Sequence, residues 1–133
     1  MSHHLKFQHH FVELPHEQER FAIFVGTDSL GVVRAVAKVS PFGPQVKPFV
    51  SGVHVDEAYR SKGIGGKLMR CIARKALMND CHTLALYVHH DNVDARRFYS
   101  SLGFIAYLDD GDDILMAAPI IDILQTEGLK EAA

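Results

Sequence analysis

The chain has no tryptophan and only two cysteines among its 133 residues. Cys71 falls within a predicted helix, and Cys81 lies just before a predicted strand. Two cysteines placed in this way favour neither a disulfide framework nor a metal knuckle. We therefore expect both thiols to be reduced and to have structural roles.

The sequence also has little net charge and no long apolar run. Its formal charge of -2 gives no basic surface for general binding of nucleic acid. No apolar run approaches the roughly 20 residues that span a bilayer, and the opening stretch MSHHLKFQHH lacks the apolar middle of a signal peptide. These absences favour a cytoplasmic protein with no membrane or nucleic-acid partner.

Histidine, by contrast, is abundant, with nine residues that include the adjacent pairs His3-His4, His9-His10 and His89-His90. Adjacent side chains on a strand point to opposite faces, so such a pair does not hold one metal ion by itself. We expect no metal site.

Alternating apolar residues bounded by turn signals predict seven strands. Their ranges are 6–14, 21–26, 32–39, 49–55, 83–88, 104–108 and 114–118. The strand at 83–88 (TLALYV) is apolar on both faces, which is typical of a central strand that is covered on both sides. In the strand at 32–39, apolar residues share one face while Arg34 and Lys38 lie on the other, so we expect the antiparallel sheet to have a dry side and a wetter one.

Apolar residues three and four positions apart predict a long amphipathic helix over 64–78. Several cations fall mostly off its apolar stripe: Lys67, Arg70, Arg74 and Lys75. A shorter helix follows Asp94, which can cap it, and ends at Gly103.

The order of these elements predicts the fold class. Strand, helix and strand over 49–88 form a crossover whose two strands are parallel, with antiparallel strands before it and a hairpin around DDGDD after it. We predict a mixed α/β (α+β) fold in a single domain over residues 1–133, with its core at about 21–118. The tail after Pro119 is compatible with a short helix, an added strand or partial disorder.

A glycine-rich stretch, YRSKGIGGK, opens the long helix. It is not a Walker A loop, because Ser61 takes the place of the first glycine and Leu68 that of the Ser or Thr. It is not a dinucleotide fingerprint, since Leu68 replaces the third glycine. What remains is a set of helix N-terminal amides that an anion can approach closely. This predicts a phosphate site; the other interpretation is a tight turn with solvated cations. The cations are Arg60, Lys62 and Lys67.

Two motifs in the chain resemble those of the GCN5-related N-acetyltransferase (GNAT) superfamily. Its cofactor motif, Arg/Gln-x-x-Gly-x-Gly/Ala, is similar to Arg60-Ser61-Lys62-Gly63-Ile64-Gly65, and Val55 stands five residues before the arginine, where the family usually has a valine. Its second motif, with an Asn, an aromatic pair and Gly-Phe, is similar to NVDARRFYSSLGF, which begins at Asn92. The resemblance covers about residues 21–118.

This resemblance implies acetyl-CoA or a related acyl-CoA as donor, bound where the two central parallel strands splay apart. The main chain of Val53 and Val55 would pair with the pantetheine arm, because a splayed strand edge presents free N–H and C=O groups. The amide of Asn92 would contact the cofactor from the other strand. The pyrophosphate would lie on the amides of the glycine-rich stretch, whose cofactor-binding residues are Arg60, Ser61, Lys62, Gly63, Ile64, Gly65, Gly66 and Lys67.

The resemblance also implies catalytic residues. Tyr99 matches the position of a tyrosine whose hydroxyl lies near the thioester sulfur, where it would protonate the departing thiolate. A core aromatic on the inner stripe of the short helix is the other interpretation of Tyr99. His54 is a candidate general base, because histidine ordinarily changes charge near neutral pH. His54 also fits a merely structural strand histidine, and His89 and Asp91 remain alternatives as the base.

The chain departs from the family in one respect. Family members usually carry two helices between their first and second strands, and here only PHEQER separates them. The acceptor side is then open, or it is covered by the tail or by a second subunit in a homodimer. The resemblance implies transfer of an acetyl group from acetyl-CoA to a primary amine of a protein, peptide or small molecule. The alternative is a non-catalytic acyl-CoA sensor or interaction module.

Overall fold

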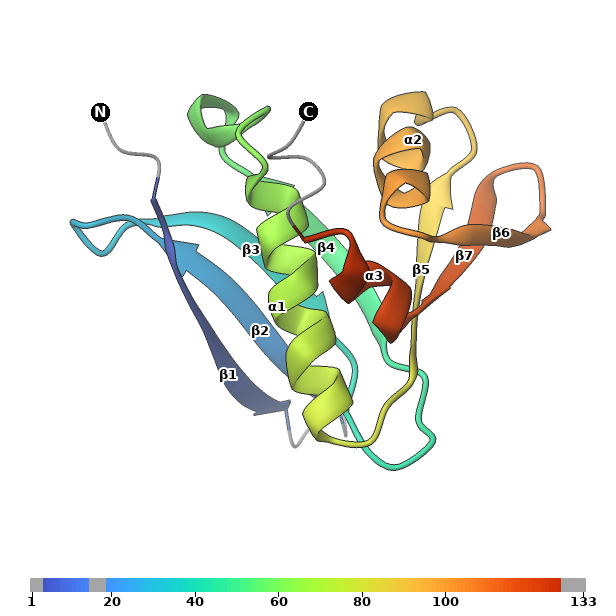
Figure 1. Ribbon diagram of the computed structural model, residues 1–133, viewed down its shortest axis with the longest axis horizontal. Helices are drawn as coiled ribbons and strands as arrows, with labels where there is room; N and C mark the ends of the chain where they lie inside the picture. Colours follow the sequence, from blue (N-terminus) through green and yellow to red (C-terminus); the bar gives the residue numbers. More distant parts are fainter. Residues whose placement is uncertain (1–3, 15–18, 128–133) are drawn as a thin grey trace.

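The computed structural model describes residues 4–14 and 19–127. They form one sheet of seven strands in the order β1-β2-β3-β4-β5-β7-β6 (Figure 1). The strands are β1 (Lys6–Leu14), β2 (Glu19–Thr27), β3 (Val33–Val39), β4 (Phe49–Val55), β5 (Thr83–His89), β6 (Ile105–Asp109) and β7 (Asp113–Pro119). The helices are η1 (Glu57–Tyr59), a 3₁₀ turn, and α1 (Ile64–Met78), α2 (Val93–Ser101) and α3 (Ile120–Gln125). The predicted mixed α+β class is confirmed.

Strands β1 and β2 follow each other directly. They pair antiparallel from Lys6↔Thr27 to Leu14↔Glu19, so four residues join them. Those residues, including Pro15, which we expected to close the first strand, lie outside the described residues. Because four residues cannot form two helices, the missing N-terminal helix pair is confirmed.

The parallel crossover is also as predicted. Helix α1 has the predicted bounds, and β4 pairs with β5 in parallel at only two positions, Phe49↔Ala85 and Val50↔Leu86. Beyond Val50, β4 runs on to Val55 without a partner in β5, and β5 pairs on its other side with β7. The two parallel strands therefore separate in the middle of the sheet.

One extra residue bulges out of β4 just after the strands separate. Val36 pairs with His54 and Lys38 with Ser51, so two steps along β3 match three along β4. Gly52 lies within the bulge at φ 59, a left-handed conformation that glycine tolerates best. Since a one-residue shift moves side chains to the opposite face, the bulge puts His54 on the same face as Ser51.

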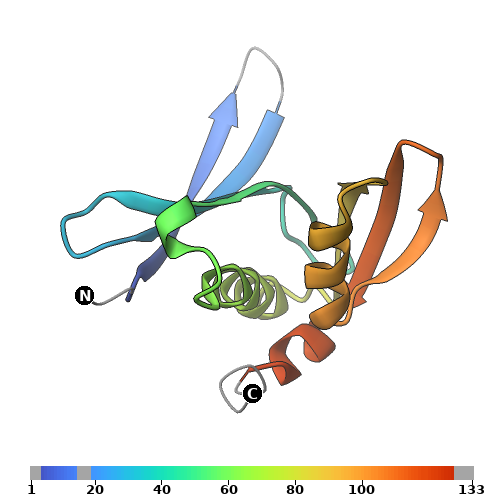
Figure 2. The same ribbon diagram turned by 90° about the horizontal axis from the view of Figure 1, so that it is seen from above.

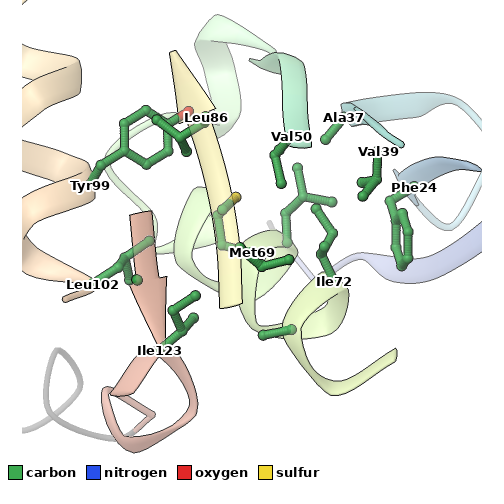
Figure 3. Packing of buried hydrophobic residues seen from close by; sticks show 14 of the residues in the cluster. Phe24, Ala37, Val39, Val50, Met69, Ile72, Leu86, Tyr99, Leu102 and Ile123 are labelled. Atoms are coloured by element: carbon green, nitrogen blue, oxygen red, sulfur yellow. The ribbon is translucent and has the colours of Figure 1, made fainter. Parts of the chain in front are cut away.

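All three α-helices lie on one side of the bent sheet (Figure 2). Central sheet residues on this side are buried, for example Ala37, Val39 and Leu86, and they pack on Met69 and other apolar residues of α1 (Figure 3). Full burial of each large apolar side chain contributes about 1.5–3 kcal/mol to stability. We call the opposite side, on which no described α-helix packs, the open face.

The open face corrects the expectation for β5. Leu84, Leu86 and Val88 point to the helices and are buried, but Tyr87 points the other way and is 60% exposed. The face of β5 that carries Tyr87 is therefore only partly covered, since Ala85 on the same face is buried. Tyr87 stacks on Phe49 of β4, with ring centroids 5.6 Å apart.

Arg70 is a second departure. We expected it mostly off the apolar stripe of α1, yet it is buried, and its Nη1 donates to Oγ1 of Thr126, just after α3. Helix α3 packs on α1, so the start of the predicted tail covers this side of the helix. The end of that tail, from Gly128, lies outside the described residues. No helix in the described part of the chain is long and apolar enough to cross a membrane.

Candidate acyl-CoA site

A cleft of about 610 Å³ opens where β4 leaves β5, between β4, the start of α1, and α2. It is lined by Val53, His54, Val55, Tyr59, Arg60, Ser61, Gly63, Ile64, Gly65, Gly66, Asp94, Ala95, Phe98 and Tyr99. Ten of the thirteen predicted site residues are in this lining. The other three, Lys62, Lys67 and Asn92, are exposed and belong to the same loop and helix starts. The fold thus gathers two sequence motifs around one cleft.

The glycine-rich loop presents backbone to the cleft. Ser61 and Gly63 have left-handed φ angles of 61 and 76, and Gly63 is the N-cap of α1 with no side-chain cap hydrogen bond. A Cβ built on Gly63 would meet nothing within 4 Å, so the loop is open at this point. Uncapped amides at a helix start, next to a loop of alternating backbone handedness, fit an anionic group such as a pyrophosphate.

Gly65 serves a different purpose. A Cβ at Gly65 would lie 3.1 Å from the Cζ atom of Phe98 on α2. The missing side chain therefore lets α2 approach the first turn of α1. This contact brings the second motif to the wall of the cleft opposite β4.

Arg60 folds back onto the strand that precedes it. Its Nε donates to the carbonyl oxygen of Val55 at 2.8 Å. Val55 lies on the buried side of β4, opposite Ala35 of β3. The guanidinium thus links the end of β4 to the glycine-rich loop at the cleft.

Asn92 caps α2, and this corrects the expectation that Asp94 does so. The Oδ1 of Asn92 accepts a hydrogen bond from the backbone N–H of Ala95 at 3.1 Å. Asp94 instead lies in the first turn and lines the cleft. The cap occupies one lone pair of the Asn92 oxygen and leaves both N–H groups of this amide to donate to a ligand.

Tyr99 lies on the inner side of α2 and is 9% exposed. Its ring packs against Phe98 and edge-on against Phe104, and it points from α2 toward β5 beside Leu86 (Figure 3). Burial raises the pKa of Tyr99 to about 12, because desolvation disfavours the phenolate. Its hydroxyl is therefore protonated at neutral pH and can donate a hydrogen bond.

His54 is on the open face of β4 and its side chain is 57% exposed. Its Nε2 lies 3.8 Å from Oδ1 of Asp56, and the other carboxylate oxygen of Asp56 accepts from Nη1 of Arg34 at 3.1 Å. Asp28 accepts from Nε of the same arginine at 2.9 Å. Backbone N–H groups and Arg34 lower the pKa of Asp28, so its carboxylate holds the arginine in place.

The two alternative bases lie elsewhere. His89 ends β5, and its Nδ1 accepts from the backbone N–H of Asp91 at 3.2 Å. Neither residue lines the cleft, whereas His54 does. Among the three candidates, the position of His54 alone suits a base for chemistry inside the cleft.

Four cleft residues were not among the predicted site residues: Tyr59, Asp94, Ala95 and Phe98. Three of them belong to the second motif and lie on the same helix as Tyr99. Their helical spacing from Tyr99 could have predicted that they face the same cleft. Tyr59 directly precedes Arg60 and is buried, with the Arg34 guanidinium 5.4 Å from its ring centroid. Nothing local in the sequence distinguishes this aromatic residue from one in a surface loop.

The sequence matches the family model described as the acetyltransferase (GNAT) family over residues 2–104. The chain belongs to the GNAT family. A curated relative, N-alpha-acetyltransferase 30 of Saccharomyces cerevisiae, is 25% identical over 105 residues, which are 73% of this chain and 60% of the relative. The chain thus spans less than two thirds of the length of that relative.

Solved structures with the GNAT fold agree with this assignment. The ribosomal-protein-S18-alanine N-acetyltransferase from Escherichia coli is 26% identical, with a TM-score of 0.63 over 75% of this chain and 69% of that chain. The PaiA N-acetyltransferase from Thermoplasma acidophilum, in complex with coenzyme A, is 20% identical, with a TM-score of 0.66 over 73% and 59%. Both structures support the GNAT fold of this chain.

Proposed function

We propose that the protein transfers an acetyl group from acetyl-CoA to a primary amine. The observation that carries this proposal is the cleft itself, which joins an open glycine-rich loop, the end of β4 that has no partner in β5, a protonated tyrosine and an exposed histidine. The names of two relatives, both N-acetyltransferases of amino groups, support an amine as the acceptor.

The proposed cofactor residues fit an acyl-CoA. The backbone amides from Lys62 to Lys67, in the loop and the first turn of α1, would hold the pyrophosphate. Arg60, Lys62 and Lys67 would supply positive charge. The backbone of Val53 and Val55 would pair with the pantetheine amides as a strand pairs with an added strand. Asn92 would donate to the cofactor through its amide nitrogen. When bound, the group supplies a thioester carbonyl that an amine can attack.

The catalytic residues would act from the two sides of the sheet. His54, on the open face, would take the proton that the acceptor nitrogen loses as its bond to the acetyl carbon forms. Tyr99, on the helix side, would donate a hydrogen bond to the sulfur as the C–S bond breaks. A thiol has a pKa of about 8.5, below that of Tyr99, so the phenol would stabilise the thiolate as a donor more readily than it would give up its proton.

The second candidate function, an acyl-CoA-binding module without catalysis, is favoured by two observations. The helix pair that would form a wall of the acceptor pocket is missing, and His54 is largely exposed. A module would keep the cleft for the cofactor and need no acceptor wall.

Labelled acetyl-CoA distinguishes these functions. The protein is incubated with it and with peptides, small amines and cell extract, and acceptors are identified by mass spectrometry. We expect label on amino groups. Normal binding of acetyl-CoA in a thermal-shift assay without any transfer would support the module, and no shift with CoA, acetyl-CoA or longer acyl-CoAs would reject the cofactor.

A further inference from the structure

Arg70 of α1 carries a charge inside the protein. It is 6% exposed and is the only charged side chain that is buried among the described residues. Its Nη1 donates to Oγ1 of Thr126, a neutral hydroxyl, at 3.3 Å. Since a guanidinium keeps its proton at any ordinary pH, this burial fixes a positive charge in the interior. No step of the proposed reaction uses this charge.

The guanidinium of Arg70 reaches back to the first turn of α1, as long side chains in helices do. A Cβ built on Gly66 would lie 3.0 Å from Nη1, 3.4 Å from Nη2 and 3.5 Å from Cζ of Arg70. The guanidinium therefore fills the space that a side chain at position 66 would take. Gly66 is the third residue of α1, so its N–H is among the first amides, which have no carbonyl partner within the helix. The charge thus lies beside the amides that begin the helix.

Gly66 lines the acyl-CoA cleft, whereas Arg70 does not, so the backbone of Gly66 separates the charge from the cleft. The start of a helix carries about half a positive charge, to which Arg70 adds a full one. A cation at this end opposes the helix dipole until an anion comes to lie there. A buried charge acts through a lower dielectric constant than the exposed Lys62 and Lys67, and salt screens it less. Arg70 therefore favours an anion in front of the first amides.

We propose that Arg70 is a positioning residue for the pyrophosphate of acyl-CoA, which it attracts across the first turn of α1 without touching it. Thr126, just after α3, holds the guanidinium in this place. The start of the tail after Pro119 thereby takes part in binding the cofactor. This inference rests on the proposed function and deepens it, because Arg70 selects a donor that carries phosphates over a thioester that carries none.

The test measures the dissociation constants of three donors with the full chain, by NMR titration, which also detects weak binding. The donors are acetyl-CoA, acetyl-dephospho-CoA, which lacks the 3′-phosphate, and S-acetylpantetheine, which has no phosphate. We expect Arg70→Met to weaken the binding of the first two about tenfold and to leave that of S-acetylpantetheine unchanged. Arg70→Lys keeps the charge and should recover most of the lost affinity.

Gly66→Ala is a second variant, which leaves Arg70 in the chain. Its Cβ would point at Arg70 rather than into the cleft, so it should push the guanidinium away and weaken acetyl-CoA binding in the same direction. Arg74→Met is the matched control, because Arg74 lies one turn further along α1, is 51% exposed and pairs with Glu127 at 3.6 Å. It removes the same charge and should leave all three dissociation constants within twofold.

An unchanged dissociation constant for acetyl-CoA in Arg70→Met would overturn the proposal. Three other results would do the same: an equal loss in Arg74→Met, an equal loss for S-acetylpantetheine, and a loss confined to acetyl-CoA, which would assign the charge to the 3′-phosphate. If Arg70→Met does not fold, Gly66→Ala decides, and unchanged binding of acetyl-CoA by this variant overturns the proposal. Absence of acetyl-CoA binding by the wild type would instead overturn the proposed function.

Discussion

The two faces of the sheet differ in what covers them. On the helix side, Leu86 and the buried residues of β3 pack on α1, and Tyr99 sits in a protein environment dry enough to raise its pKa to about 12. On the open face, Tyr87 of the same strand β5 is mostly in solvent. The two tyrosines, Tyr99 and Tyr87, thus have opposite surroundings: the first is buried and the second is in solvent.

In the proposed reaction, the two sides of the sheet would therefore have different roles. The covered side holds groups that must be fixed and desolvated, which are the glycine-rich loop and the tyrosine donor. The open side holds His54, the group that must meet an incoming substrate. The separation of β4 from β5 is the passage between them.

The largest expected effect is on the covered side, at the loop. Gly65→Asp places a carboxylate against the proposed pyrophosphate position and should abolish the thermal shift with acetyl-CoA. A ligand that binds only the folded state stabilises it by about 2.7 kcal/mol at 100 times Kd, so the loss is easily measured. Gly65→Ala is the control: its Cβ makes the same contact with Phe98 without the charge, and part of the shift should remain. A full shift with Gly65→Asp would contradict this location.

The second effect is on turnover, again from the covered side. Tyr99→Phe removes the proposed donor to sulfur and should lower kcat about 100-fold, within the usual range for acid–base catalysis, without weakening acetyl-CoA binding. Steady-state kinetics and the thermal shift together separate the two quantities. Tyr107→Phe, on the exposed edge strand β6, should change neither. An unchanged kcat in Tyr99→Phe would leave Tyr99 as a packing residue.

The third effect is on the open face and is smaller. His54→Gln should lower kcat about tenfold, because water can replace an exposed base more easily than a buried donor. The same measurement on His89→Gln, at the end of β5 and outside the cleft lining, should give the wild-type rate. A larger loss in His89→Gln than in His54→Gln would assign the base to the other strand.

The smallest effect is on stability at alkaline pH and compares two tyrosines directly. The folded protein holds the Tyr99 proton more tightly than the unfolded chain, whose tyrosines titrate near pH 10, so folding loses stability as pH rises above about 10. At pH 11 this loss is about 1.4 kcal/mol, of which about 1 kcal/mol arises between pH 10 and 11.

Tyr99→Phe should therefore flatten the fall in stability between pH 10 and 11, as measured by urea unfolding. Tyr87→Phe, on the open face, should leave the fall as it is in the wild type. If stability fell equally with pH in both variants, Tyr99 would be no more desolvated than Tyr87.

The elements that carry the site could be predicted from the sequence because their signals are local. Helix α1 has its predicted bounds, since its apolar stripe begins right after Gly63 and lasts four turns. The crossover follows from chirality once the helix and the flanking strands are recognised. Residues in or next to the two motifs make up most of the cleft lining.

The rest depends on contacts that no local pattern records. The bulge at Gly52 adds one residue inside β4, and a glycine within a strand does not by itself fix the register, so the face of His54 could not be deduced. Asn92 and Asp94 are both good capping residues. The helix begins at Val93, which makes Asn92 the cap, and the sequence pattern does not fix this first residue. Arg70 is buried where α3 returns to α1, and Thr126 after α3 accepts its hydrogen bond.

The hydrogen bond from Arg60 to Val55 has an energetic consequence. In the proposed complex the carbonyl that would receive a pantetheine amide already accepts from Arg60. If the cofactor displaced this donor, the new contact would return less free energy than one with a bare acceptor, because one hydrogen bond would replace another. The released guanidinium would then lie beside the glycine-rich loop and the two phosphates, and binding would weaken more steeply with salt.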